Sequence, residues 1–297
     1  MTTDAKLQLR ELLAPHRRRV NEDLERWLIE PGTPETLAQA LRYCALDVGK
    51  RLRPAMVYLA AEAVGADPDD ELTRRSAVAV ELVHTYSLVH DDLPAMDDDA
   101  LRHGKPTVHV QYDEAMAILV GDALLTRALG LLGETNDPCS GRLVTELAAA
   151  AGGAGMIAGQ VADMDLCTLP GGAEGLWYIH QRKTAALLVG AVRMGAICGG
   201  AGDVELQAVS RFARCLGLAY QITDDLLDVT GTVENLGKTP GKDARTGKRT
   251  SVSVLGLEGA RQRERQLTAD ADEALKALGA SADPLRNLAG LLVGRTF

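Results

Sequence analysis

The sequence predicts an all-α fold in a single domain. Aromatic residues make up only 3% of the 297 residues, while alanine, leucine and glycine are abundant. This composition suits close-packed helices better than sheets, which favour aromatic and β-branched residues. Hydrophobic residues account for 46% of the chain, enough for a large core. Strand signals are sparse and no segment resembles a long flexible linker, so one domain over residues 1–297 is favoured.

Helical periodicity runs along almost the whole chain. Turn-forming residues separate the segments, as at Pro31 to Pro34, Pro170 to Gly172 and Gly199 to Gly202. Residues 148–155 are all alanine or glycine, which we interpret as close backbone packing between helices. The predicted helices span residues 4–30, 34–48, 53–65, 70–91, 112–134, 141–165, 174–198, 203–229, 252–278 and 284–294.

Charge and cysteine content limit the possible partners and compartments. The formal net charge is -9, which argues against bulk nucleic-acid binding because that needs a basic face. The five cysteines are odd in number and none forms a closely spaced pair, as expected in a reducing compartment. The first residues lack a secretory apolar core, and no apolar run reaches the roughly 18 residues of a spanning helix. We therefore expect a cytoplasmic protein without stable membrane insertion.

Five aspartates gather in residues 91–99, directly after an apolar helical run. Pro94 should end or kink that helix, which leaves the carboxylates near the negative end of its dipole. This placement is unfavourable unless a cation compensates it. Mg²⁺ commonly binds one or two carboxylates together with substrate phosphates. If the kink brings Asp91 and Asp97 together, they can act on one cation.

A second acidic cluster ends another apolar helical run. Asp224 and Asp228 are four residues apart and share a helix face, and Gln221 joins that face. Like charges at this spacing repel one another, so the arrangement destabilises the helix on its own. A metal ion bound by both carboxylates would turn this repulsion into a net attraction.

Cations flanked by glycine surround these acids in the sequence. Lys183 interrupts an apolar helix, and a buried charge is normally paired. Two acidic clusters and several cations together suggest metal-bridged binding of a polyanion, most simply a diphosphate. The candidate cations are Lys50, Arg53, Arg102, Lys183, Lys238 and Lys248.

These motifs give the chain a resemblance to a known family. It resembles a trans-isoprenyl diphosphate synthase (class I polyprenyl synthetase), closest to the bacterial farnesyl diphosphate synthase branch. The similar segments follow in family order from about residue 45 to 260, and the two aspartate motifs together are highly specific. They are 49–54, 84–99, 121–124, 159–160, 183–184, 221–228 and 236–238. The resemblance implies the isoprenoid synthase fold, a bundle of about ten or more helices around a central cavity, and a homodimer.

The resemblance also implies roles for individual residues. Gly49, Lys50, Arg53, His84 and His103 would form the site for the diphosphate of isopentenyl diphosphate. Three Mg²⁺ ions are implied, with the ligands Asp91, Asp92, Asp97, Asp224, Asp225 and Asp228. The allylic diphosphate would be held by Arg102, Lys183, Lys238 and Lys248. Lys183, Thr184 and Gln221 lie where the family stabilises the allylic cation. The catalytic set would be Asp91, Asp92, Asp97, Arg102, Lys183, Thr184, Gln221 and Asp224.

The implied reaction is a Mg-dependent condensation of isopentenyl diphosphate with an allylic diphosphate. Tyr86 lies five residues before Asp91 and, with the small Ser87 beside it, would set the pocket floor. An aromatic residue there, together with the Pro94-Ala95 insertion, resembles fifteen-carbon synthases, which favours mainly farnesyl diphosphate as product, although the small Thr85 and Ser87 leave the floor not wholly blocked. The alternatives are a geranylgeranyl diphosphate synthase, a non-catalytic partner subunit and a terpene cyclase. The intact motifs argue against a non-catalytic subunit, and the isopentenyl site argues against a cyclase.

The chain departs from the family pattern at His103, where a second arginine is usual. Histidine is shorter and mostly neutral near pH 7, so we expect weaker or more pH-dependent isopentenyl diphosphate binding.

Overall fold

The computed structural model describes residues 3–46, 49–230 and 249–293. Within these ranges the chain is a succession of helices with one short hairpin, which confirms the all-α prediction. The elements are α1 (Thr3–Trp27), α2 (Glu35–Ala45), α3 (Leu52–Ala63), α4 (Glu71–Asp91), β1 (Leu101–Arg102), β2 (Lys105–Pro106), α5 (Val108–Gln111), α6 (Glu114–Gly133), α7 (Ser140–Ala151), α8 (Met156–Asp163), α9 (Gly172–Ile179), the π-helix η1 (His180–Ala185), α10 (Ala186–Cys198), α11 (Asp203–Thr230), α14 (Ser251–Ala274), the 3-10 helix η2 (Leu275–Ala282) and α15 (Asp283–Val293).

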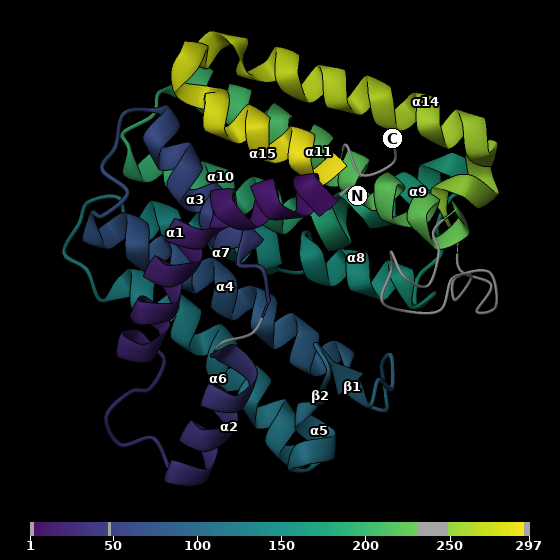
Figure 1. Ribbon diagram of the computed structural model, residues 1–297. Coiled ribbons are helices and arrows are strands. Elements are labelled where there is room, and N and C mark those ends of the chain that lie inside the picture. The colour runs from purple at the N-terminus through teal and green to yellow at the C-terminus, as the bar shows by residue number, and fades with distance from the viewer. Residues whose placement is uncertain (1–2, 47–48, 231–248, 294–297) are drawn as a thin grey trace.

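Helix α4 lies at the centre of the bundle. It packs against α3, α6 and α10, while α11 joins α10 to α14 (Figure 1). Residues 76 to 83 of α4 are all buried, including Glu81, because the helix is apolar on nearly every side. One hydrophobic cluster runs from Leu9 in α1 to Val293 in α15. The C-terminal end of this central helix carries the aspartates and lies next to the hairpin.

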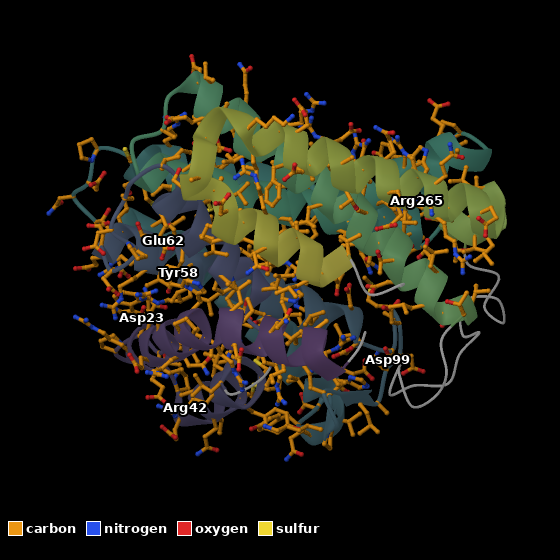
Figure 2. All side chains as sticks on the ribbon, turned by 45° about the horizontal axis from the view of Figure 1, so that its top comes forward. Asp23, Arg42, Tyr58, Glu62, Asp99 and Arg265 are labelled. Atoms are coloured by element: carbon orange, nitrogen blue, oxygen red, sulfur yellow. The ribbon has the colours of Figure 1, made fainter. Side chains whose placement is uncertain are left out.

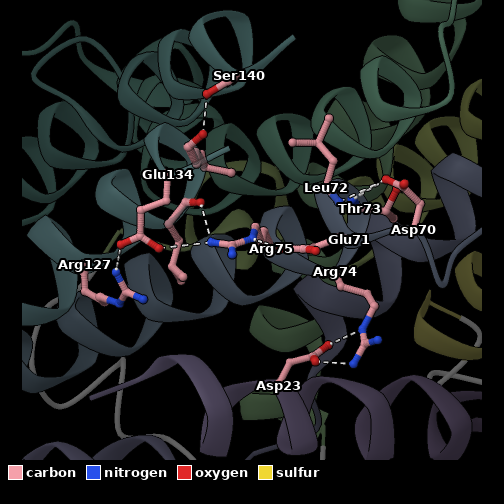
Figure 3. A network of polar contacts seen from close by, with 12 residues as sticks. Asp23, Asp70, Glu71, Leu72, Thr73, Arg74, Arg75, Arg127, Glu134 and Ser140 are labelled. Carbon is pink, nitrogen blue, oxygen red and sulfur yellow. Dashed lines mark hydrogen bonds and ion pairs between the residues drawn. The ribbon is translucent and has the colours of Figure 1, made fainter. Parts of the chain in front are cut away.

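Polar contacts anchor the opposite end of α4 (Figure 3). The Asp70 carboxylate caps the helix by accepting hydrogen bonds from the amides of Leu72 (3.0 Å) and Thr73 (3.3 Å). Arg74 forms an ion pair with Asp23 of α1, and Arg75 forms one with Glu134 (3.1 Å) after α6. Figure 2 shows Asp23 on one side of the molecule and Asp99, from the aspartate-rich loop, on the other. Helix α4 is thus fixed at the end away from its aspartates.

The helix predicted over 141–165 is wrong as a single element. It breaks into α7 and α8 at residues 152–155, inside the run of alanine and glycine. A Cβ atom on Gly155 would lie 2.2 Å from the carbonyl oxygen of Ala150, so the turn needs glycine there. The run therefore marks a helix break and not a continuous packing surface.

Other predicted boundaries also shift. The helix predicted over 174–198 contains the π-helix η1, and the one predicted over 112–134 is preceded by the short α5. The helix predicted over 252–278 ends in η2. In α4, the prediction that Pro94 would end the helix is confirmed, because α4 stops at Asp91 with Asp92 as its C-cap.

Helix α6 is the most membrane-like helix that the structure describes. By length and composition it could cross a bilayer, and it is the only such helix of at least 18 residues in the described ranges. It packs along α4, and 44% of its apolar window is buried inside the protein, as in the core helices of many folds.

Candidate active site

A cationic pocket lies between the start of α3, the middle of α4 and the hairpin. Its volume is about 280 Å³. The predicted isopentenyl-site residues all line it, although they come from three parts of the chain: Gly49, Lys50, Arg53, His84 and His103, together with Arg102. The structure thus brings together residues that were selected from the sequence by motif alone.

Two basic side chains of this pocket, Arg53 and His84, lie where burial disfavours their charged forms. The Nε atom of Arg53 has no hydrogen-bond partner there, and burial lowers the pKa of its guanidinium, opposed by Glu81 and Tyr220. Burial also lowers the pKa of His84 well below 6.5, and the charges of Arg53 and Arg102 lower it further. Arg53 stands in the first turn of α3, whose N-terminal amides favour anions. The pocket therefore combines basic side chains with a helix N-terminus, an arrangement that favours anions.

The hairpin holds Arg102 against the aspartate loop. The Arg102 guanidinium donates to the Asp92 carboxylate through Nε (2.8 Å) and Nη2 (2.6 Å). The Tyr43 hydroxyl of α2 donates to the Pro106 carbonyl oxygen (2.7 Å) and ties the hairpin to the bundle. Asp92 is buried, so its predicted role as an assisting metal ligand competes with this ion pair.

His103 occupies the tip of the hairpin. It and Gly104 have φ angles of 51° and 78°, as a type I′ turn requires at both central positions. Its side chain is exposed, and its pKa is lowered from 6.5 by partial burial and by Arg102 and Arg51. His103 therefore faces the pocket as a mostly neutral side chain at pH 7.

The loop after α4 folds back on the helix end. The amide of Asp97 donates to the carbonyl oxygen of Asp91 (2.8 Å), and the amide of Met96 to that of Leu93 (2.8 Å). Asp91 and Asp97 are thereby brought together, as joint binding of a cation requires. Burial raises the pKa of Asp91 to about 6; Lys183 opposes this rise and the charge of Asp97 adds to it.

Lys183 reaches this loop from the π-helix η1. Its ammonium group pairs with the Asp163 carboxylate of α8 at 2.6 Å. Helix α8 approaches η1 so closely that a Cβ atom on Gly159 would lie 2.0 Å from the backbone nitrogen of Lys183. A single π-turn inside a helix is often found at functional sites.

A chain of hydrogen bonds joins η1 to the second aspartate cluster. The Thr184 hydroxyl donates to Gln221 Oε1 (3.1 Å), and Gln221 Nε2 donates to Asp225 Oδ1 (3.2 Å). Asp225 Oδ2 accepts a hydrogen bond from the amide of Ser251 (2.7 Å), the first residue of α14, so this carboxylate binds the N-terminal end of that helix. Asp224 is half-buried, and Asp228 is buried with no partner for Oδ1 within the described ranges.

Tyr86 lies below the aspartate loop inside α4. Its side chain is 6% exposed and packs edge-to-face on His90, with ring centroids 5.8 Å apart. Its hydroxyl has no hydrogen-bond partner in the part of the chain described. The neighbouring Ser87 hydroxyl donates to the carbonyl oxygen of His84 (2.8 Å) in its own helix.

Comparison with known proteins identifies the family. The family model described as Polyprenyl synthetase matches residues 34–279. The chain belongs to the polyprenyl synthetase family. The farnesyl diphosphate synthase of Escherichia coli (strain K12) is 43% identical over 268 residues, which cover 88% of this chain and 89% of that enzyme. A chloroplastic geranylgeranyl pyrophosphate synthase of Capsicum annuum is 44% identical over 285 residues, which cover 93% and 76%.

Solved structures agree with this assignment. The apo crystal structure of an FPP/GFPP synthase from Zymomonas mobilis has a TM-score of 0.85 and 36% identity, and the match covers 97% of this chain and all of that one. The chain is thus a trans-prenyltransferase of the polyprenyl synthetase family with the isoprenoid synthase fold. The relatives divide between farnesyl and geranylgeranyl synthases.

The carboxylates suit the Mg²⁺ that such a prenyltransferase needs. Asp91 and Asp97 offer hard oxygen donors, and the repulsion between their charges, which raises the pKa of Asp91, favours a cation beside them. No group of three or more histidine, cysteine or acidic side chains within the described residues is arranged to hold a metal by itself. The ions would therefore share their coordination with substrate phosphates, as Mg²⁺ commonly does.

The structure leaves two predicted site residues undescribed and places several unpredicted ones beside the candidate site. Lys238 and Lys248 lie outside the described residues. Glu81, Tyr220 and Arg51 line the cationic pocket, and Asp163 pairs with Lys183, although none of these was predicted as a site residue. Arg51 stands between Lys50 and Arg53, but nothing in the sequence separates its role from theirs. Asp163 lies four residues after Gly159, one helical turn along α8.

Proposed function

We propose that the protein is a Mg-dependent prenyltransferase that condenses isopentenyl diphosphate with an allylic diphosphate (dimethylallyl or geranyl), mainly to farnesyl diphosphate. The observation that carries this proposal is that two sites of opposite charge lie beside α4, here called half-sites: the cationic pocket and the aspartate cluster. On one side lie Arg53, whose Nε atom has no hydrogen-bond partner among the described residues, and the largely neutral His84; on the other lie Asp91 and Asp97, where the charges of Lys183 and Arg102 oppose the raised pKa of Asp91.

Isopentenyl diphosphate belongs in the cationic pocket. Its diphosphate would replace water around Arg53 and His84 and accept hydrogen bonds from both, with Lys50 at the rim and His103 at the hairpin tip. A desolvated cation that has no internal partner binds an anion strongly, since binding removes the cost of the unpaired charge.

The allylic diphosphate belongs beside the aspartates. We propose Asp91, Asp97 and Asp224, with Asp92, Asp225 and Asp228 near them, as the residues that hold three Mg²⁺ ions. When bound, the ions neutralise the charge of the diphosphate leaving group. Lys183 and Arg102 would add direct contacts from η1 and the hairpin, and Lys238 and Lys248 stay predicted contacts.

The chemistry follows from charge and position. The C–O bond of the allylic diphosphate breaks and leaves an allylic cation. The isopentenyl double bond attacks that cation, a new C–C bond forms, and a proton leaves to the departing diphosphate. Thr184 and Gln221, fixed by their hydrogen bond, would face the developing positive charge with oxygen atoms. No nucleophilic side chain is required, and positioning and electrostatics supply the catalysis.

Tyr86 supports farnesyl diphosphate as the main product. Its buried ring lies in the helix that ends at Asp91 and would limit the depth of the pocket for the growing chain. Geranylgeranyl diphosphate is the second candidate, because relatives that make it are as similar to this chain as a farnesyl synthase is.

Assembly and location are also proposals. We propose a homodimer, because the apolar side chains of Ile118 and Leu119 on α6 are 47% and 55% exposed and Val110 of α5 beside them is 50% exposed. A cytoplasmic enzyme without membrane insertion remains our prediction.

Ligand binding with and without metal tests the two half-sites. Calorimetric titration should show isopentenyl diphosphate binding both in EDTA and in Mg²⁺, because only cationic side chains hold it. Geranyl diphosphate should bind tightly only with Mg²⁺. Arg53→Ala should weaken the binding of isopentenyl diphosphate, and Asp91→Asn should weaken the binding of geranyl diphosphate. If isopentenyl diphosphate requires Mg²⁺, or if both variants weaken both ligands equally, the assignment of the half-sites is wrong.

A further inference from the structure

Arg51 stands between two ligands of the cationic pocket but is not itself available to an anion. Its side chain is 2% exposed. The guanidinium donates to Asn21 Oδ1 of α1 (2.9 Å), to Glu81 Oε1 of α4 (2.7 Å) and to the carbonyl oxygen of Ala45 in α2 (2.6 Å). Every nitrogen of the guanidinium therefore has an internal acceptor, each on a different helix.

The backbone at Arg51 is in an unfavourable conformation. Its φ angle is 56° and its ψ angle 38°, in the left-handed region where glycine and asparagine are usual. The residue is the N-cap of α3 and has no capping hydrogen bond from its side chain. Such strain persists only where the surroundings hold it, and it occurs preferentially at functional sites. Here the three side-chain hydrogen bonds hold it.

This turn determines where the neighbouring cations point. Lys50 precedes the strained residue and is exposed, whereas Arg53 follows it and lies half-buried in the first turn of α3. Both line the same pocket. An ordinary right-handed conformation at residue 51 would redirect the chain between them, so the two cations would no longer converge on one ligand.

Arg51 also neutralises the charge of Glu81. This carboxylate is 5% exposed and lines the pocket, where an unpaired negative charge would repel a diphosphate. It also lies within electrostatic reach of Arg53. The ion pair with Arg51 neutralises Glu81, and Arg53 keeps its hydrogen-bond donors for the ligand.

We propose that Arg51 is a positioning residue for isopentenyl diphosphate: it holds the left-handed turn that aims Lys50 and Arg53 into the pocket, and it neutralises Glu81. This inference rests on the proposed function of the pocket. It assigns Arg51 no contact with substrate, which separates its role from those of the two cations beside it.

The test compares Arg51→Met with a matched control, Arg193→Met. Arg193 also forms a two-pronged ion pair, to Glu146 (2.7 and 2.5 Å), and a hydrogen bond to Ser210 (3.0 Å), but it does not line the pocket. Arg51→Met should raise the KM for isopentenyl diphosphate about tenfold or more, equivalent to about 1.4 kcal/mol. The KM for the allylic substrate should change much less. Arg193→Met should leave the KM for isopentenyl diphosphate unchanged.

Two further variants separate the two tasks. In Arg51→Met/Glu81→Gln the carboxylate charge is gone, so part of the lost affinity should return. Arg51→Asn tolerates the left-handed backbone but cannot neutralise Glu81, so its KM should lie between those of the wild type and Arg51→Met. The inference is overturned if the double variant binds isopentenyl diphosphate more weakly than Arg51→Met, or if Arg193→Met raises the KM equally. Failure of the wild-type protein to bind isopentenyl diphosphate would instead refute the function of the pocket.

Discussion

At the scale of single residues, the two half-sites differ in the charge that each leaves uncompensated. Burial lowers the pKa values of Arg53 and His84 in the cationic pocket. Asp91 is a half-buried acid whose pKa is raised to about 6. A diphosphate near Arg53 and His84 and a divalent cation near Asp91 would oppose these shifts, because each stabilises the charged form of its neighbours.

The His103→Arg variant tests the departure from the family pattern. Below its pKa, which is already lowered from 6.5, His103 gains a positive charge, so the KM of the wild type for isopentenyl diphosphate should fall as pH drops from 8 to 6. Arginine is charged throughout this range and should lower the KM at pH 8 by about tenfold or less, as one charge-assisted hydrogen bond would. Steady-state kinetics at several pH values measure this. Equal KM values for the two proteins from pH 6 to 8 would show that His103 takes no part in binding.

The Tyr86→Ala variant tests the pocket floor. Loss of the ring should deepen the pocket and shift the products from fifteen toward twenty carbons, at a stability cost of roughly 3–5 kcal/mol for a buried aromatic residue. Chromatography of the dephosphorylated products gives the ratio of chain lengths. This ratio does not depend on how much of the variant is folded. An unchanged ratio would remove Tyr86 from the floor.

At the scale of elements, α4 could be predicted almost completely, whereas the π-helix η1 could not. The apolar run before Asp91 and the position of Pro94 determine both the path and the end of α4. No sequence pattern in residues 180–185 predicts a π-turn, and the close approach of α8 to the backbone at Lys183 is a tertiary contact that local sequence does not encode. The ion pair of Lys183 with Asp163 was unpredictable for the same reason, since it needs the break between α7 and α8.

The Gly159→Ala variant tests whether this close contact positions Lys183. The added Cβ atom would lie 2.0 Å from the Lys183 backbone, so η1 must move. We expect a stability loss of roughly 1–3 kcal/mol, as for other overpacked sites, and a marked fall in kcat. Gly130→Ala in α6 is the control, because its nearest neighbour would be 3.8 Å away, and it should be neutral or slightly stabilising. Full activity in Gly159→Ala would mean that the placement of η1 is unimportant.

At the scale of the whole molecule, the all-α fold follows from composition and periodicity, but the convergence of distant residues does not. Lys50, His84 and His103 could be selected only by their resemblance to family motifs; that they share one pocket depends on how α3, α4 and the hairpin pack. The contacts of Arg51 likewise depend on tertiary packing, because its acceptors lie on α1, α2 and α4. Contacts between residues distant in the chain produce no periodic pattern, so the sequence alone does not predict them.

The exposed apolar side chains of α6 lead to a prediction about assembly. Leu119→Glu should place a charge in the proposed subunit contact and convert a dimer to a monomer. Val204→Glu is the control, because Val204 is 70% exposed at the start of α11, away from α6. Light scattering after size-exclusion chromatography reports the mass. A wild-type monomer, or a dimer that both substitutions leave intact, would contradict the proposed surface.

Elongation by the purified protein tests the central claim most directly. It is incubated with Mg²⁺, isopentenyl diphosphate and, in turn, dimethylallyl, geranyl or farnesyl diphosphate, and the products are analysed by chain length. Our account predicts Mg-dependent elongation of the first two primers, mainly to fifteen carbons, and little extension of the third. Absence of elongation with every primer would contradict the assignment as a prenyl diphosphate synthase.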